Sequence, residues 1–343
     1  MTAKSPRDER YYGFHDLEVH TVTDHPTVGR GLARIARGLG WVPNPGPSDD
    51  GEPLRLEILT RGVDEKADDE AVVGETYGGL ETWRFRDRFT LRGPGVVAFL
   101  RPAAGLARAL VSPTAWEAED GPPEVDLNLV YLSLMILLRH RGIHSMHAAG
   151  LVRSDKGLLV VATAGAGKST LALALLEAGW KALSDDSVVL RPMGDGVEAL
   201  ALRRDLYLEP PALEGFPGLT ERWQDPPLGA SSKRWLALEA AFPGQSVERC
   251  KPRWVLFPRA VDRAVSELRP LPSHHALGKL IGQSFLVFLE PTRASAQIEA
   301  LRRLVQQSRC YELLTGRDLL EDPTAVARRV AEALEDDLDA AQS

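Results

Sequence analysis

In the first third of the chain, apolar residues repeat first with a helical period and then with the two-residue period of strands. Residues 27–39 repeat with a helical period, so that an apolar face and an arginine face are separated. The apolar face holds Val28, Leu32, Ile35 and Leu39, and the other face holds Arg30, Arg34 and Arg37. A loop rich in Pro and Gly is expected over 41–53. Strict alternation then predicts strands at 54–58, 83–86, 89–91 and 95–100. This order of elements predicts an N-terminal α+β domain over residues 1–122.

The rest of the chain begins with a continuous apolar run and then changes period. The run at 127–138 is shorter than the about 20 residues that a bilayer-spanning helix needs, so it predicts a buried helix. Strands are expected at 146–154 and 157–162, a helix at 169–178 that stops at Gly179, and a strand at 181–190. This order predicts a βαβ unit. A strand at 253–257 and helices at 293–307 and 323–336 complete an α/β domain over residues 123–343.

Composition narrows the class of protein. Apolar residues make up 44% of the 343 residues, which predicts a packed core, and the net charge of −7 argues against nucleic acid as a partner. The two cysteines, Cys250 and Cys310, fit no C-x-x-C spacing and suit a reducing compartment. The polar N-terminus has no apolar core typical of a signal peptide. We therefore expect a cytoplasmic protein that does not bind a membrane.

The stretch VVATAGAGKST at 160–170 carries the clearest chemistry. An apolar strand precedes it and an apolar helix follows, as a phosphate-binding loop requires. Gly165 and Gly167 let backbone N–H groups point at phosphate oxygens, Lys168 reaches the β- and γ-phosphates, and Ser169 coordinates Mg²⁺. Ala162 replaces the usual first glycine, which is tolerable if its φ stays negative. The predicted nucleotide-binding residues are Ala164, Gly165, Ala166, Gly167, Lys168, Ser169 and Thr170.

Two adjacent carboxylates, Asp185 and Asp186, follow at the point where the next strand leaves the core. Nucleotide-dependent phosphotransferases need a carboxylate there to hold Mg²⁺, and a second one can accept the proton of an attacking hydroxyl. Adjacent strand residues point to opposite faces, so the two need not share one task.

These three segments, MHAAGLV, VATAGAGKST and ALSDDSV, resemble the catalytic domain of the HPr kinase/phosphorylase family. They are closer still to the wider group of HPr-kinase-like biosynthetic kinases, which includes the lasso-peptide kinases. The resemblance implies a phosphate-loop fold related to phosphoenolpyruvate carboxykinase, with ATP and Mg²⁺ as cofactors. It further implies that Asp185 is the general base, that Asp186 and Ser169 bind the metal, and that Lys168 and His147 take part in catalysis.

Other candidate residues carry weaker signals. The family's second signature, a Glu-x-Arg-Gly-x-Gly loop, is absent, which argues against HPr as the substrate. Lys233 and Arg234 are a possible phosphate or substrate contact. Arg84, Arg86 and Arg88 are expected on one strand face, either simply solvated or as a docking edge for an acidic peptide. Zinc is not expected at His140, His144 and His147, because their spacing fits no helix face and no acidic partner is near.

The sequence therefore predicts a Mg²⁺-ATP-dependent kinase that phosphorylates a hydroxyl, favouring serine on a peptide or protein and forming a homo-oligomer. Two alternatives remain open: a kinase of small molecules, and a non-catalytic ATP-binding module that regulates a partner.

Overall fold

The computed structural model describes residues 7–47, 51–60, 72–117, 123–163, 165–202, 205–224 and 234–340. It contains helices and several sheets, which confirms the expected mixed α/β class. Contacts divide the chain after Gly142 into a first and a second unit. Among the described helices, none is both long and apolar enough to cross a membrane.

The first unit contains a nine-stranded sheet in the order β3-β1-β2-β4-β9-β8-β7-β6-β5. Strands β2, β4 and β9 are parallel to one another, and the remaining pairs are antiparallel. The strands are β1 (Asp8–Phe14), β2 (Leu17–Thr23), β3 (Val42–Asn44), β4 (Leu54–Leu59), β5 (Val72–Tyr77), β6 (Leu80–Phe85), β7 (Arg88–Gly93), β8 (Val96–Arg101) and β9 (Leu106–Leu110).

Two helices pack on this sheet. Helix α1 (Pro26–Gly38) contacts β1 and β2 through the predicted apolar face, and helix α2 (Glu124–His140) contacts β4, β6, β8 and β9. Because α2 is buried against the first sheet, the units divide at 142/143, later than the boundary expected at 122/123. The apolar run was predicted correctly as a helix, but the unit to which it belongs was not.

The expected arginine face at 84–88 is not present. Arg84 lies near the end of β6, Arg86 adopts a φ of 54° in the tight turn, and Arg88 starts β7. In the antiparallel register Arg84 is opposite Phe89 and Arg88 is opposite Phe85, so Arg84 and Arg88 point to opposite faces. The two-residue turn, which alternation alone does not reveal, separates these side chains.

The second unit contains the sheet order β10-β14-β15-β18-β12-β11-β13, with β20 paired to β18 and β19. Its strands are β10 (His144–His147), β11 (Ala149–Arg153), β12 (Lys156–Val160), β13 (Lys181–Ser184), β14 (Ser187–Met193), β15 (Gly196–Ala201), β18 (Arg249–Ala260), β19 (Glu267–Pro270) and β20 (Arg309–Thr315). A separate ribbon pairs β16 (Leu206–Leu208) with β17 (Arg234–Leu236). The helices are α3 (Lys168–Glu177), α4 (Pro210–Leu213), α5 (Leu238–Ala241), α6 (Ser273–Gly282), α7 (Phe285–Leu289), α8 (Ala294–Gln307), α9 (Asp318–Glu321) and α10 (Pro323–Ala340).

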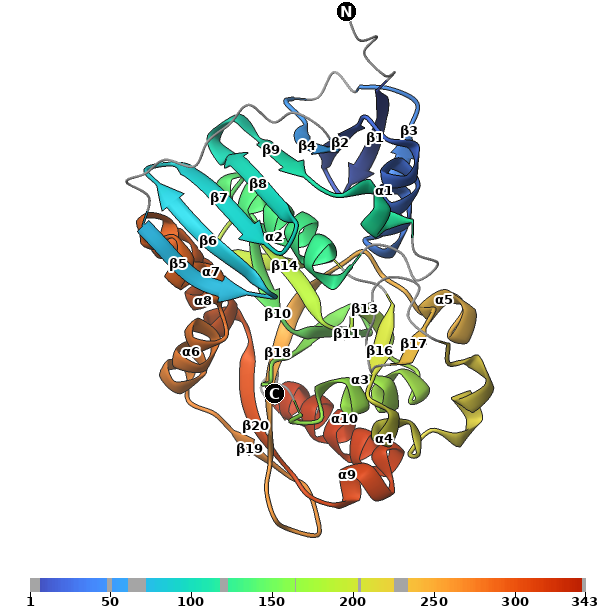
Figure 1. Ribbon diagram of the computed structural model, residues 1–343. Helices are drawn as coiled ribbons and strands as arrows, with labels where there is room; N and C mark the ends of the chain where they lie inside the picture. The colour runs from blue at the N-terminus through green and yellow to red at the C-terminus, as the bar shows by residue number, and fades with distance from the viewer. Residues whose placement is uncertain are drawn as a thin grey trace, which may run out of the picture. The chain divides into compact units, whose positions relative to one another are not determined.

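Helices cover both faces of the centre of this sheet (Figure 1). Leu158 and Val160 of β12 join the core beneath α3 and α10, whereas Leu159 and Val161 join the core beneath α6 and α8. Strands β12, β18 and β20 are mutually parallel, so their carboxyl ends meet at one edge. A parallel sheet covered on both faces binds ligands at that edge, beyond the strand ends.

Two predicted strands are each broken in two. The strand expected at 146–154 divides at Ala148 into β10, which pairs with β14, and β11, which pairs with β12 and β13. The strand expected at 181–190 divides at Asp185 and Asp186 into β13 and β14. The βαβ unit is also wider than expected, because β11 lies between the parallel strands β12 and β13. The second break sets the two carboxylates at a strand end.

One buried ion-pair cluster in the first sheet makes the stability of that unit depend on pH. Glu57 of β4 is 4% exposed and accepts hydrogen bonds from Arg55 Nε at 2.7 Å and Arg108 Nε at 2.5 Å. Burial alone would raise the pKa of Glu57, but the hydrogen bonds and charges of Arg108 and Arg55 outweigh it and lower the pKa below its ordinary value. The ionised carboxylate therefore stabilises the folded state.

We predict that this stabilisation is fully present above the ordinary pKa of glutamate and is lost as the pH falls through the lowered pKa of Glu57. Glu57→Gln should reduce the free energy of unfolding at pH 7 by about 1.5–3 kcal/mol and flatten its dependence on acid pH. Urea unfolding from pH 7 to pH 3 measures both effects. The control Glu81→Gln changes an exposed carboxylate on β6 and should leave the curve unchanged. An equal loss in the two variants would contradict the assignment.

Candidate functional site

The glycine-rich loop lies between β12 and α3, at the carboxyl edge of the parallel strands. Gly165 and Gly167 have φ values of 78° and 88°, which favour glycine, and Gly167 is the N-cap of α3. The loop thus ends at a helix N-terminus, where the backbone N–H groups of the first turn have no intrahelical partner. This arrangement suits an anion such as phosphate.

Ala162 does not disturb the loop. It is 3% exposed and does not adopt a positive φ, so its methyl group is accommodated in the core. This meets the condition under which alanine was expected to be tolerated. Of the predicted loop residues, Ala164 lies outside the described chain, while Ala166 and Thr170 are buried and Ser169 is partly exposed.

Lys168 joins the start of α3 to the break between β13 and β14. Its side chain is 8% exposed, and Nζ donates to the Asp185 carbonyl oxygen at 3.0 Å and to Asp186 Oδ1 at 2.8 Å. A buried ammonium is costly unless it is paired and hydrogen-bonded. These contacts therefore hold the lysine at the strand end beside the loop.

Asp186 also faces His147, the last residue of β10. Asp186 Oδ1 lies 3.4 Å from His147 Nδ1, and the side chains of Asp186 and His147 are 30% and 41% exposed. Burial alone would raise the pKa of Asp186, but the hydrogen bond from His147 and the charge of Lys168 outweigh it and hold the pKa well below its ordinary value. Asp186 is therefore ionised at neutral pH and can be reached from solvent.

Asp185 has a different environment. It is 2% exposed, and its Oδ2 accepts a hydrogen bond at 3.1 Å from the backbone N–H of Tyr207, on β16. Burial and the neighbouring Asp186 carboxylate raise the pKa of Asp185. The charge of Lys168 and the nearby Ser169 hydroxyl oppose this rise without cancelling it.

The pair formed by Asp185 and Ser169 has the chemistry of a magnesium site. Asp185 Oδ1 is buried and has no hydrogen-bond partner in the described part of the chain. An unsatisfied carboxylate oxygen beside a hydroxyl is a ligand set that a hard cation prefers. Among the described residues, no three His, Cys, Asp or Glu side chains converge to hold a metal ion. This sparse ligand set fits Mg²⁺, which usually keeps waters and takes further ligands from substrate phosphates.

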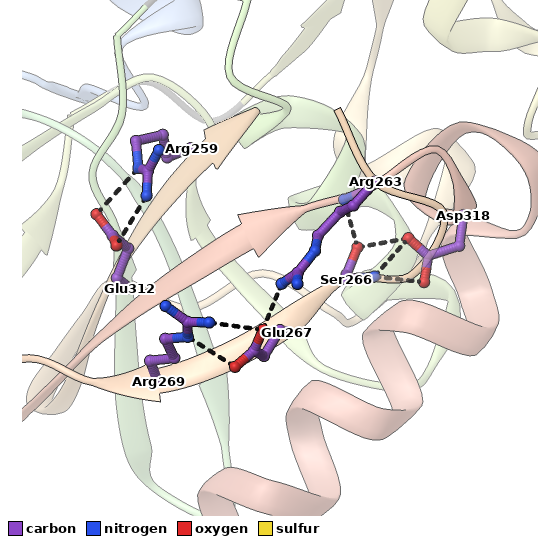
Figure 2. A network of polar contacts seen from close by, with 8 residues as sticks. Arg259, Arg263, Ser266, Glu267, Arg269, Glu312 and Asp318 are labelled. Carbon is purple, nitrogen blue, oxygen red and sulfur yellow. Dashed lines mark hydrogen bonds and ion pairs between the residues drawn. The ribbon is translucent and has the colours of Figure 1, made fainter. Parts of the chain in front are cut away.

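A cavity of about 610 Å³ opens from the glycine-rich loop toward the end of β18. Its lining includes Thr163, Gly165, Phe257, Arg259, Lys279 and Gln283. The two basic residues of this lining, Arg259 and Lys279, are both paired with Glu312 of β20. Arg259 Nε and Lys279 Nζ each lie 3.3 Å from Glu312 Oε1. Figure 2 shows the two-pronged contact between Arg259 and Glu312 on the neighbouring strands β18 and β20. The volume and the positive lining suit a ligand larger than phosphate that carries negative charge.

The second basic candidate pair is described only in part. Lys233 lies outside the described residues, and Arg234 is exposed at the start of β17, opposite Leu208 in the ribbon. Leu208 follows Tyr207, whose N–H contacts Asp185, so Arg234 belongs to the same ribbon as a residue of the site.

Three residues of the site were not found from sequence. Tyr207 acts through its backbone, which carries no sequence signal. Arg259 and Lys279 are far along the chain from the loop, and only the parallel pairing of β12 with β18 brings the end of β18 beside it. The rule that ligands bind at the carboxyl ends of parallel strands could have indicated Arg259, since it follows the strand predicted at 253–257.

No protein-family model and no curated protein sequence matches this chain. Among solved structures, the chain is similar to the HPr(Ser) kinase/phosphatase from Coxiella burnetii, with 12% sequence identity and a TM-score of 0.31. The match covers 58% of this chain and 97% of that protein.

The packing of the loop against α9 gives a direct test of its geometry. A Cβ at Gly167 would lie 2.7 Å from Cδ2 of the buried Leu319, whereas a Cβ at Gly165 would meet nothing within 4 Å. Both changes to alanine strain a positive φ at a cost of about 1–2 kcal/mol. Gly167→Ala should lose about 1–3 kcal/mol more, because the core must also move.

Urea unfolding of Gly165→Ala and Gly167→Ala measures this difference. Removing the obstacle with Leu319→Ala should abolish the extra loss in the Gly167→Ala background. Equal destabilisation by the two glycine changes would contradict the described approach of Leu319 to the loop.

Proposed function

We propose that this protein is a kinase that transfers the γ-phosphate of ATP to a hydroxyl group, the serine of a peptide or protein, with Mg²⁺ as its cofactor. The observation that carries the proposal is the position of Lys168. Its ammonium lies between a helix N-terminus preceded by positive-φ glycines and a strand end that bears two carboxylates. Phosphoryl transfer needs a cation, backbone donors and carboxylates in such proximity.

The nucleotide would occupy the glycine-rich loop and the adjoining cavity. The free N–H groups at the start of α3 are suited to the phosphates, which supports binding of a nucleotide rather than of a neutral ligand. Arg259 and Lys279 could exchange part of their pairing with Glu312 for contacts to the nucleotide. Neither Arg259 nor Lys279 is fixed by burial, since the side chains are 54% and 40% exposed.

The environments of the two aspartates favour roles opposite to those expected from sequence. Asp186 is partly exposed and ionised, and a phosphate that draws Lys168 away would remove one cause of its low pKa, so we assign it as the base that receives the proton of the acceptor hydroxyl. Asp185 is buried beside Ser169, out of reach of a bulky acceptor, so we assign it with Ser169 to the metal. Bound there, Mg²⁺ would neutralise charge on the phosphates.

In the proposed reaction the acceptor oxygen forms a bond to the γ-phosphorus while the bond from that phosphorus to the β–γ bridging oxygen breaks and ADP leaves. The acceptor proton passes to Asp186 Oδ1 or Oδ2. Lys168, released from its pairing with Asp186, stabilises negative charge on the transferred group. His147 faces the same carboxylate and would orient it.

We predict that Lys168→Ala loses nucleotide affinity, whereas Asp186→Asn keeps ATP affinity and loses about 10²–10⁴-fold in transfer rate. Asp185→Asn should instead weaken the Mg²⁺-dependent part of ATP binding. Calorimetric titration at several Mg²⁺ concentrations and single-turnover transfer to serine peptides separate binding from chemistry.

Asp195→Asn, at an exposed turn between β14 and β15, is the matched control and should behave as wild type in both assays. Transfer that survives Asp186→Asn but not Asp185→Asn would restore the order of roles expected from sequence. Tight ATP binding by wild type with no transfer to any hydroxyl would favour the non-catalytic module instead.

A further inference from the structure

A second cavity, entirely within the first unit, is lined by cations and aromatic rings. It measures about 590 Å³ and lies between α1 and the edge of the sheet formed by β1 and β3. Its basic residues are Arg10, Arg30, Arg34 and Arg37, and its aromatic residues are Tyr11, Tyr12 and Trp41. Its lining also includes one carboxylate, Glu9, whose Oε2 lies 3.1 Å from His20 Nε2. No part of the proposed kinase site contributes to it.

The arginines that line the cavity differ in the partners they have among the described residues. Arg10 is paired with Asp8 at 2.7 Å, and Arg30 donates to the Thr27 hydroxyl at 3.1 Å. Arg34 and Arg37 are exposed and form no ion pair within the described part of the chain. In a protein of net charge −7, such a concentration of cations is not a background property of the surface. It indicates a negatively charged ligand.

The spacing of the arginines indicates the shape of this ligand. Arg30 and Arg37 are seven residues apart on one helix, which corresponds to about 10.5 Å along the helix axis. One phosphate or carboxylate is too small to contact all three arginines of α1. An extended peptide rises about 3.3–3.4 Å per residue and turns alternate side chains to the same side. Its acidic side chains at every second residue would therefore follow the arginine row.

The edge strand argues for recognition through side chains rather than through strand addition. Strand β3 is the edge of the sheet, and Pro43 and Pro45 line the cavity. Proline has no backbone N–H, so this edge cannot donate a regular ladder of hydrogen bonds to an incoming strand. The buried rings of Tyr12 and Trp41, whose centroids are 5.7 Å apart, supply an apolar wall instead.

We infer that this cavity is a docking site for an acidic peptide segment with carboxylates at alternate positions. Arg34 and Arg37 form charge-assisted hydrogen bonds with the carboxylates, and the aromatic wall receives an apolar side chain between them. The role of this peptide as part of the kinase's acceptor rests on the proposed function. Its binding does not, because the cavity is separate from the glycine-rich loop.

The test measures binding of a fluorescently labelled peptide, with three glutamates at alternate positions, to the full chain by anisotropy. The Arg34→Ala/Arg37→Ala variant should bind at least about tenfold more weakly, and affinity should fall as salt rises from 50 to 200 mM. Arg34→Lys/Arg37→Lys should keep part of the affinity, since the charge remains and the paired donors are lost. The peptide with glutamine in place of glutamate should not bind.

The matched control is Arg86→Ala/Arg88→Ala, which removes two exposed arginines of the same unit and should change affinity less than twofold. Unchanged affinity in Arg34→Ala/Arg37→Ala, loss of affinity in the control, or equal binding of the glutamine peptide would each overturn the inference. Lys168→Ala should bind the peptide as wild type does. Binding of the glutamate peptide by wild type, together with no phosphoryl transfer to any serine-bearing peptide, would overturn the proposed function and leave the docking site standing.

Discussion

The site depends on one buried ammonium group. Lys168 Nζ is shared between the Asp185 carbonyl oxygen and the Asp186 carboxylate, and it reaches them because the glycine-rich loop turns α3 back over the broken strand. A lysine this deeply buried is tolerated only while both acceptors are in place. The requirement fixes three features together: the break between β13 and β14, the start of α3, and the separation of Asp185 from Asp186. An anion arriving at the loop would compete with Asp186 for the same ammonium, so ligand binding and release of that carboxylate are physically coupled.

Sequence patterns located the centre of the second unit because its layers impose simple rules. A parallel strand covered on both faces reads as a continuous apolar run, as 157–162 does, and a helix that ends at a left-handed glycine reads as 169–178 does. Patterns failed where pairing partners change within an apparently continuous stretch. No proline marks the break at Ala148, and only the pairing of β10 with β14 and of β11 with β12 and β13 separates the two strands. The same limit applies to the first unit, where the two-residue turn at Arg86 placed Arg84 and Arg88 on opposite faces.

The two aspartates show which properties of a site cannot be predicted from the sequence. Their order at a strand end was readable, and so was the expectation that they point in different directions. The partners of the buried one come from the ribbon formed by β16 and β17: the Tyr207 N–H satisfies one oxygen of Asp185, and the other has no partner in the part of the chain that the structure describes. That ribbon is short, and its contact with Asp185 is made by the backbone N–H of Tyr207. The contact therefore does not depend on the residue type at 207 and cannot be predicted from it. A resemblance transfers residue identities, whereas the burial and the partners that shift the pKa of each carboxylate are set by the fold.

The arginines of the first unit also differ in whether they have a carboxylate partner among the described residues. Arg55 and Arg108 are hydrogen-bonded to the buried Glu57, which would be costly to leave unpaired in the sheet. Arg34 and Arg37 project from the polar face of α1, whose apolar face already anchors the helix to β1 and β2. The buried residues of α1 are Val28, Gly29, Gly31, Leu32, Ile35 and Ala36, so its packing does not depend on the side chains of Arg34 and Arg37. Arg34 and Arg37 have no ion-pair partner in the part of the chain that the structure describes, and their positive charge faces a cavity that suits a negatively charged ligand.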